Sequence, residues 1–207
     1  MLKLNRRAMI ALAAAATAAM SPALAEDAVT PAAGPGDFSI GAADAKVKIV
    51  EYASYTCPHC ANFHETVFGA LKKNYIDTGK VHFTLREVYF DRYGLWAAMV
   101  ARCGGDMRYF GIHDMLFAKQ SEWSASEDPA QVVENLKAIG LAAGVDQAAL
   151  ETCLNDQANA EAMIAQFETN MAADDVKGTP TIIVNGTKYS NMTYDELAAI
   201  IDAELAK

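Results

Sequence analysis

The stretch YTCPHCANFH, residues 55–64, contains two cysteines separated by Pro58 and His59, and His64 follows four residues after the second cysteine. Such a pair can be a redox centre, part of a metal site or a structural disulfide, and the surrounding sequence decides between them. Residues 47–52, VKIVEY, are apolar and β-branched with one acidic interruption, so they predict a buried strand that leads into the pair. Beyond the pair, every fourth residue is apolar, which predicts a helix with one buried face; these residues are Phe63, Val67, Leu71 and Tyr75.

The position of Cys57 at the start of this helix has a chemical consequence. Pro58 suits the first helical turn, where its missing N–H would have no intrahelical partner. The free N–H groups and the partial positive charge of a helix N-terminus favour a thiolate, so we expect the pKa of Cys57 to lie below the free value of about 8.5. A protonated His59 would add to this effect. Cys60 lies one turn further along, so we expect Cys57 to be the attacked and attacking sulfur and Cys60 to resolve the mixed disulfide.

The remaining sequence predicts the order β-α-β, helical block, β-β-α. Residues 81–90 predict a second strand, parallel to the first, and residues 91–174 predict only helices. Residues 181–184 predict a third strand, which an Asn-Gly turn connects to a short return strand. A capping box of Thr193 and Glu196 opens the last helix. Inward-facing positions expected in the helical block are Leu95, Met99, Cys103, Val133, Leu136, Ile139, Leu150, Cys153, Leu154, Met163, Phe167 and Met171.

A family resemblance rests on three segments of the chain. A Cys-x-x-Cys pair near a β-α-β pattern is typical of thioredoxin-like proteins. Together with EYASYTCPHC at 51–60, the helical block at 91–174 and GTPTIIVNG at 178–186, it makes the chain resemble the bacterial DsbA family of periplasmic thiol:disulfide oxidoreductases. The resemblance implies an α/β fold, in which a thioredoxin-like domain of residues 40–90 and 175–207 carries an inserted all-helical domain of residues 91–174.

The resemblance also implies a role for each residue of the tetrad. Cys57 would be the reactive cysteine and Cys60 its partner. Pro58 and His59 would set the redox poise of the pair. No bound cofactor is expected for this chemistry.

Three further residues gain roles in the same way. Pro180 would be a cis proline that packs against the cysteines, and Thr179 before it would offer backbone groups to an extended substrate. Glu51 matches a buried acid that relays the proton of Cys60. The alternative for Glu51 is a solvent-facing position at the edge of the sheet.

Cys103 and Cys153 each fall on the apolar face of a predicted helix. An even number of cysteines in an exported chain, and a second bridge in some members of the family it resembles, lead us to expect a structural disulfide between them. The alternative is two buried free thiols that pack as small apolar residues.

The first 25 residues have the pattern of a secretory signal peptide. A basic start precedes the apolar run Ala8–Met20, and the A-x-A sequence at 23–25 predicts cleavage after Ala25. The run is shorter than the roughly 20 residues that span a bilayer, which disfavours a membrane anchor. Arg6 and Arg7 leave twin-arginine export as an alternative route. Residues 26–39 are expected to form a flexible lead, too short for a separate dimerisation domain, so we expect a monomer in the periplasm.

The formal net charge of −9 argues against nucleic acid as a partner, because phosphate binding needs a cationic face. A metal site is disfavoured as well. Cys57, Cys60 and His64 have ligand-like spacing, but a structural zinc site normally takes four ligands and no second motif supplies the fourth. His64 is therefore expected to be an exposed helix residue, and no metal is expected.

These observations favour a periplasmic oxidoreductase that donates its Cys57–Cys60 disulfide to newly exported, unfolded proteins through a mixed disulfide. The resemblance implies a DsbB-type membrane quinone reductase as the reoxidant. Alternatives are a disulfide isomerase or a reductase of the same fold, which Thr179 leaves open, and then a metal-binding module or a non-catalytic chaperone.

Overall fold

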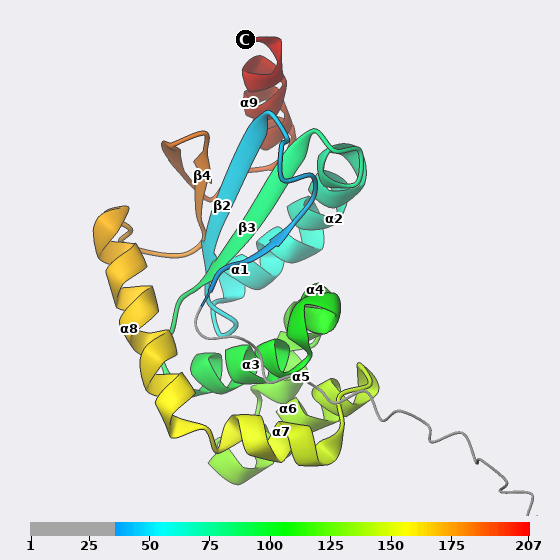
Figure 1. Ribbon diagram of the computed structural model, residues 1–207, viewed down its shortest axis with the longest axis vertical. Coiled ribbons are helices and arrows are strands. Elements are labelled where there is room, and N and C mark those ends of the chain that lie inside the picture. The colour runs from blue at the N-terminus through cyan, green and yellow to red at the C-terminus, as the bar shows by residue number, and fades with distance from the viewer. Residues whose placement is uncertain (1–35) are drawn as a thin grey trace, which may run out of the picture.

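The computed structural model describes residues 36–207, so the predicted signal peptide lies outside the described residues. A five-stranded mixed sheet forms its centre, with the strand order β1-β3-β2-β4-β5 (Figure 1). β2 and β3 run parallel, as the β-α-β pattern predicts, and all other neighbouring strands are antiparallel. The strands are β1 (Phe38–Ile40), β2 (Val47–Ala53), β3 (Val81–Glu87), β4 (Thr181–Val184) and β5 (Thr187–Ser190).

A helical segment connects β2 to β3 and alternates between α-helical and π-helical turns. It consists of α1 (Pro58–Phe63), η1 (His64–Phe68), α2 (Gly69–Leu71) and η2 (Lys72–Ile76). In an α-helix every fourth residue advances by about 40° around the axis, so a strict four-residue stripe would drift off the core face. The wider π turns counteract that drift, and all four stripe residues are buried: Phe63, Val67, Leu71 and Tyr75.

Six helices lie between β3 and β4, which confirms an all-helical insertion in a thioredoxin-like fold (Figure 1). The break between the first two is a glycine pair: Gly104 follows the last residue of α3, and Gly105, at φ 63°, begins α4 in a conformation that glycine adopts readily. The helices are α3 (Arg92–Cys103), α4 (Gly105–Ala118), α5 (Gln120–Trp123), α6 (Pro129–Ala142), α7 (Gln147–Leu154) and α8 (Gln157–Ala173).

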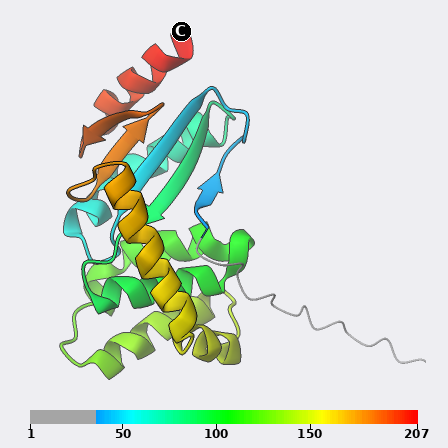
Figure 2. The same ribbon diagram turned by 60° about the vertical axis from the view of Figure 1, so that its left-hand side comes forward.

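Helices cover both faces of the sheet. The segment from α1 to η2 packs on one face beside α9 (Tyr194–Ala206), which the predicted capping box opens. On the other face, Phe167 and Met171 of α8 pack against Tyr52 of β2, and Figure 2 shows α8 crossing in front of the strands. Because side chains alternate along a strand, Glu51 points away from Tyr52 and toward the main core beneath the helical segment.

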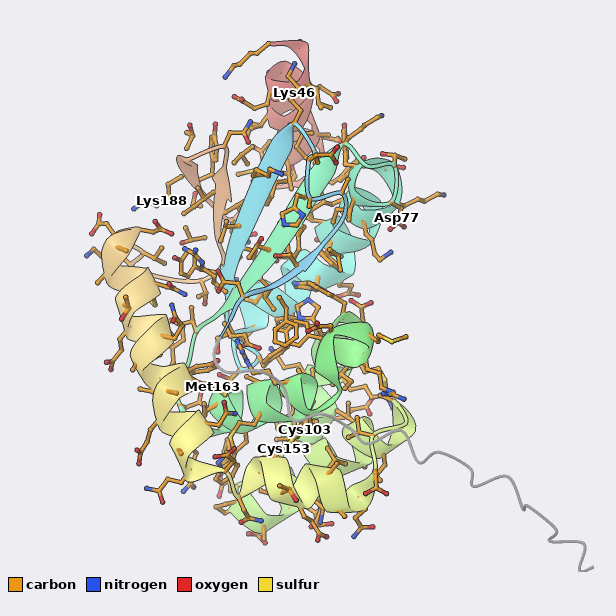
Figure 3. All side chains as sticks on the ribbon, in the orientation of Figure 1. Lys46, Asp77, Cys103, Cys153, Met163 and Lys188 are labelled. Carbon is orange, nitrogen blue, oxygen red and sulfur yellow. A yellow bond between two sulfur atoms is a disulfide. The ribbon has the colours of Figure 1, made fainter. Side chains whose placement is uncertain are left out.

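A disulfide joins Cys103 at the end of α3 to Cys153 in α7, and Figure 3 labels both residues where these two helices meet. It lies wholly within the inserted helices. Among the described residues, no helix combines the length and apolar character needed to cross a bilayer.

Three expectations from the sequence need correction. Phe38 and Ser39 belong to β1 rather than to a flexible lead, because they pair with β3 and Phe38 stacks on Tyr109 with ring centroids 3.8 Å apart. In α6 the buried valine is Val132 and not Val133, because Val132 lies on the same face of the helix as the buried Leu136 and Ile139.

The third correction concerns His64. Its side chain is only 5% exposed, because the first turns of this helix lie against both the sheet and α4.

Candidate active site

Cys57 is the N-cap residue of α1, and Pro58 is the first residue of that helix. The backbone N–H groups of Cys60 and Ala61 donate to the Cys57 carbonyl oxygen, at 3.1 and 3.2 Å, and so begin the helix. The structure thus places the cysteine where strand β2 has ended and helix α1 begins, with its side chain half-buried.

The two thiols have opposite environments. A hydrogen bond from the Cys60 thiol is the largest influence that lowers the pKa of Cys57 to about 5, and Thr179 and the backbone N–H groups of His59 and Cys60 act in the same direction. Cys60 is fully buried, and its pKa is raised by the interaction with Cys57, by burial and by the charge of Glu51. At neutral pH the favoured pair is therefore a Cys57 thiolate beside a Cys60 thiol.

The peptide bond between Thr179 and Pro180 is cis, and this dipeptide faces the cysteine pair just before β4. In its thiol form, Cys57 donates from Sγ to the Thr179 carbonyl oxygen at 3.5 Å. The Thr179 hydroxyl is buried without a hydrogen-bond partner among residues 36–207, so it is free to donate to a thiolate at Cys57. Thr179 thus interacts with the reactive sulfur through its backbone, and its side chain is available to do the same.

A groove of about 700 Å³ opens beside this dipeptide, which we call the Pro180 groove. His59 forms one wall, and the segment around the cis proline and strand β5 forms the rest. His59 is exposed and is the residue of the tetrad that lines this groove. The other lining residues are Asp175, Lys177, Gly178, Thr179, Pro180, Thr181, Lys188, Tyr189, Ser190 and Asn191.

Glu51 lies in the central strand β2, between β3 and β4, and is fully buried, so the edge-strand alternative is wrong. Burial raises its pKa to about 8 and lowers the pKa of His64 to about 3. Oε2 of Glu51 lies 3.2 Å from Nε2 of His64. Both shifts favour neutral partners, in which the carboxyl O–H of Glu51 donates to the unprotonated Nε2.

Several residues around Glu51 and His64 were not expected from sequence patterns. His113 from α4 packs edge-on against His64, with ring centroids 4.4 Å apart, and its Nδ1 lies 3.0 Å from the Tyr55 hydroxyl. Gln120 from α5 donates to the carbonyl oxygens of Tyr55 and Cys57. These contacts join residues more than 45 positions apart, and no local pattern in the sequence reports them.

The metal alternative for the tetrad is not supported by the geometry. Among residues 36–207, the one group of three potential ligands that gathers within 4.8 Å consists of His64, His113 and Asp114, and it includes neither cysteine. In that group, Nε2 of His64 already contacts Glu51 and Nδ1 of His113 contacts Tyr55.

A mixed sheet covered by helices, a Cys-x-x-Cys pair at a helix N-terminus and a cis proline facing it define the class of thioredoxin-like proteins. Comparison with protein-family models agrees, since residues 34–203 match a thioredoxin family model. Together with the relatives below, this shows that the chain belongs to the thioredoxin family and, within it, to the DsbA group.

Two curated relatives illustrate the similarity. A putative protein-disulfide oxidoreductase of Rickettsia bellii is 36% identical over 167 residues, which are 80% of this chain and 63% of the relative. The chain thus spans about three fifths of the length of the Rickettsia relatives that it matches. A probable disulfide bond formation protein D of Bacillus anthracis is 31% identical over 82% of this chain and 78% of the relative.

Among solved structures, alpha-DsbA1 of Wolbachia pipientis matches with a TM-score of 0.77 and 26% identity. The match covers 83% of this chain and 92% of that one. The helical insertion is therefore included in the similarity.

Proposed function

We propose that the protein is an exported thiol:disulfide oxidase that donates the Cys57–Cys60 disulfide to proteins with free cysteines. The observation that carries this proposal is the contrast between the two sulfurs. A stabilised thiolate at Cys57 favours the reduced pair, and a disulfide whose reduced form is favoured is a strong oxidant. The names of the Rickettsia and Bacillus relatives support the same chemistry.

The proposed reaction transfers two electrons from the substrate to the pair. A substrate thiolate attacks Sγ of Cys57, the Cys57–Cys60 bond breaks, and a mixed disulfide forms. A second substrate thiol then attacks the substrate sulfur of that bond and displaces Cys57 as a thiolate. The products are one substrate disulfide and the reduced pair, in which Cys57 stays ionised and Cys60 is protonated.

The surrounding residues have separate tasks in this proposal. Pro58 and His59 set the redox poise, since they lie between the two sulfurs and His59 also lines the Pro180 groove. Pro180 and Thr179 present backbone groups to an extended substrate in the groove. Glu51 exchanges a proton with Cys60, whose pKa it influences from within the core.

The proposal includes a cellular setting, which the sequence and the family support. Residues 1–25 direct export, cleavage after Ala25 releases a monomer in the periplasm, and a DsbB-type membrane quinone reductase reoxidises the pair. N-terminal sequencing of the exported protein should begin at Glu26. A mature chain that retains Met1 would contradict cleavage.

The oxidase activity can be tested with a reduced, unfolded peptide that contains two cysteines. The oxidised protein should convert the peptide to its disulfide with one-to-one stoichiometry, and Cys57→Ser should abolish the conversion. Mass spectrometry of acid-quenched samples counts the thiols. If the wild-type protein leaves the peptide reduced, the proposal is wrong.

An isomerase remains the second candidate, because the polar Thr179 lies next to Cys57. If the protein is an isomerase, its reduced form should restore the activity of a substrate protein whose disulfides have been scrambled. We expect this recovery to be slow relative to peptide oxidation, and a faster recovery would reverse the assignment.

A further inference from the structure

Cys60 must gain a proton each time the pair is reduced, yet its side chain has no exposed surface. The proton must therefore reach Cys60 from solvent through other residues, whereas substrate reaches Cys57 directly. A second cavity of about 570 Å³ lies along α1 and α4, and we call it the α4 pocket. Its walls include His64 and Asp114, and it shares no lining residue with the Pro180 groove.

We propose that His64 and Asp114 conduct the proton of Cys60, through Glu51, to and from the α4 pocket while substrate occupies the Pro180 groove. This inference deepens the proposed function and rests on it. It assigns a role to His64 that the sequence did not suggest, and it separates the path of protons from the path of substrate.

Electrostatics supports the first step of the route, and contacts support the others. Glu51 is close enough to Cys60 for its charge to raise the pKa of that thiol. Its carboxyl group contacts Nε2 of His64 at 3.2 Å. A ring nitrogen of His64 lies within 4.8 Å of a carboxylate oxygen of Asp114, a separation that a single bridging water spans. Asp114 is exposed and ends the route.

The other ring nitrogen of His64 supports this reading. Nδ1 is buried and has no hydrogen-bond partner among residues 36–207. A buried polar atom without a partner is costly unless another role retains it. When Nε2 accepts from Glu51, Nδ1 carries the other proton, as an imidazole that passes a proton between its two nitrogens requires.

Every proton in this route is accounted for by Cys60, Glu51, His64 and solvent. Attack on Cys57 releases Cys60 as a buried thiolate, which takes the proton of the Glu51 carboxyl group. The His64 ring then turns its N–H toward the Glu51 carboxylate and donates that proton, and the nitrogen left facing the pocket takes one from solvent, so one solvent proton is consumed for each Cys60 protonated. During reoxidation every transfer runs in reverse.

The groups around Glu51 and His64 leave few other donors. Cys60 of α1 lies near Glu51. His113 and Asp114 of α4 lie near His64, and Lys72 of η2 lies near Asp114. The neighbours of Glu51 on β3 and β4 are Leu85 and Ile182, which do not titrate.

The test follows reduction of the oxidised mature protein by glutathione, with acid quenching and thiol counting from pH 5 to 9. Rates are divided by the glutathione thiolate concentration, which removes the titration of the reductant. For the wild-type protein, the corrected rate should fall as pH rises through about 8, where Glu51 loses its proton. His64→Gln keeps an amide near the position of Nε2 but cannot relay a proton, so it should slow the reaction about tenfold or more at pH 6–7.

Chemical rescue separates a proton relay from a merely structural role. His64→Ala opens a space beside the α4 pocket, and added imidazole should restore most of the lost rate. Asp114→Asn should slow the reaction in the same direction but less. His82→Gln changes another imidazole with an unpartnered ring nitrogen, on β3 and outside both cavities, and should stay within about twofold of the wild-type rate.

Two results would overturn the relay: an unchanged pH profile in His64→Gln, or folded His64→Ala protein that is slow and insensitive to imidazole. Circular dichroism establishes that each variant is folded. The assay does not use a protein substrate. A failure to oxidise the two-cysteine peptide would therefore count against the proposed oxidase alone.

Discussion

Cys57 and Cys60 lie one helical turn apart, yet the fold gives them opposite proton affinities. Cys57 combines a helix N-terminus, the Cys60 thiol and Thr179, all of which favour its anion. Cys60 is enclosed by apolar side chains and by Glu51, and both disfavour an anion. The sequence predicts the first effect from strand, helix and proline alone, but the second depends on a residue that only the fold brings beside Cys60.

The reduced protein should show one thiolate transition near pH 5, measured by absorbance at 240 nm. Because the hydrogen bond from Cys60 contributes most to this low pKa, Cys60→Ala should move the transition toward the free cysteine value of about 8.5. The disulfide-bonded Cys103 and Cys153 do not titrate, so they leave the signal unaffected. A transition above pH 8 in the wild-type protein would contradict the environment described for Cys57.

Glu51 should make the folded state less stable as pH rises. Its pKa is higher in the folded protein, about 8, than in the unfolded chain, so its favourable contribution is present below about pH 4.5 and is lost as pH rises through 8. Glu51→Gln removes this dependence and should raise the free energy of unfolding at pH 9 relative to the wild type, by an amount on the order of a few kcal/mol.

Urea unfolding of the oxidised proteins at pH 4 and pH 9 measures the difference. At pH 4 the two proteins should be close in stability, since both side chains are then neutral. Equal stabilities at pH 9 would mean that Glu51 is not held in its neutral form.

At the scale of elements, the helix that follows Cys57 shows what sequence patterns resolve. The four-residue stripe predicted a helix with the correct buried face, but not the π turns that keep the stripe in line. The strand β4 and the capped helix α9 match their predicted positions because turn and capping residues mark their ends. β1 was missed, since three residues are too few for a periodic pattern and its order comes from β3 and Tyr109.

The Cys103–Cys153 disulfide should stabilise the helical block by cross-linking residues 50 positions apart. In the chain-entropy model a loop of this size contributes roughly 4 kcal/mol. The double variant Cys103→Ala/Cys153→Ala should lose stability of that order, while the pKa of Cys57 stays unchanged. Urea unfolding measures the loss of stability and thiolate absorbance measures the pKa. The disulfide would be excluded if both cysteines were alkylated in unfolded, unreduced wild-type protein.

At the scale of the whole molecule, the helical insertion completes the redox site rather than only covering it. α4 supplies His113 and Asp114 beside His64, α5 supplies Gln120 to the cysteine loop, and Asp91 at the start of α3 accepts a hydrogen bond from Thr56 at 2.6 Å. The sequence predicts that this block is helical but not which of its residues reach the site, because those contacts depend on how the block packs against α1.

The two redox forms should differ in stability in a way that depends on pH. The low pKa of Cys57 in the folded protein stabilises the reduced form above the unfolded value of about 8.5, and this contribution is lost as pH falls toward 5. Glu51 contributes to the stability of both forms, so its contribution largely cancels in the difference between them. The reduced form should therefore gain stability over the oxidised form between pH 5 and 8.5.

Paired urea titrations of the two forms, with the Cys103–Cys153 bridge intact, check this expectation. Cys57→Ser provides the matched control, because its stability should show no comparable pH dependence. A constant difference between the reduced and oxidised proteins across this range would contradict the linkage.

We propose that the fold favours the reduced Cys57–Cys60 pair strongly enough to make its disulfide an oxidant. The most direct test is the reduction potential of this pair, measured by equilibration in glutathione buffers at pH 7. We expect a value less negative than about −200 mV. A value at or below about −270 mV, in the range of thioredoxin, would contradict it and identify the protein as a reductant.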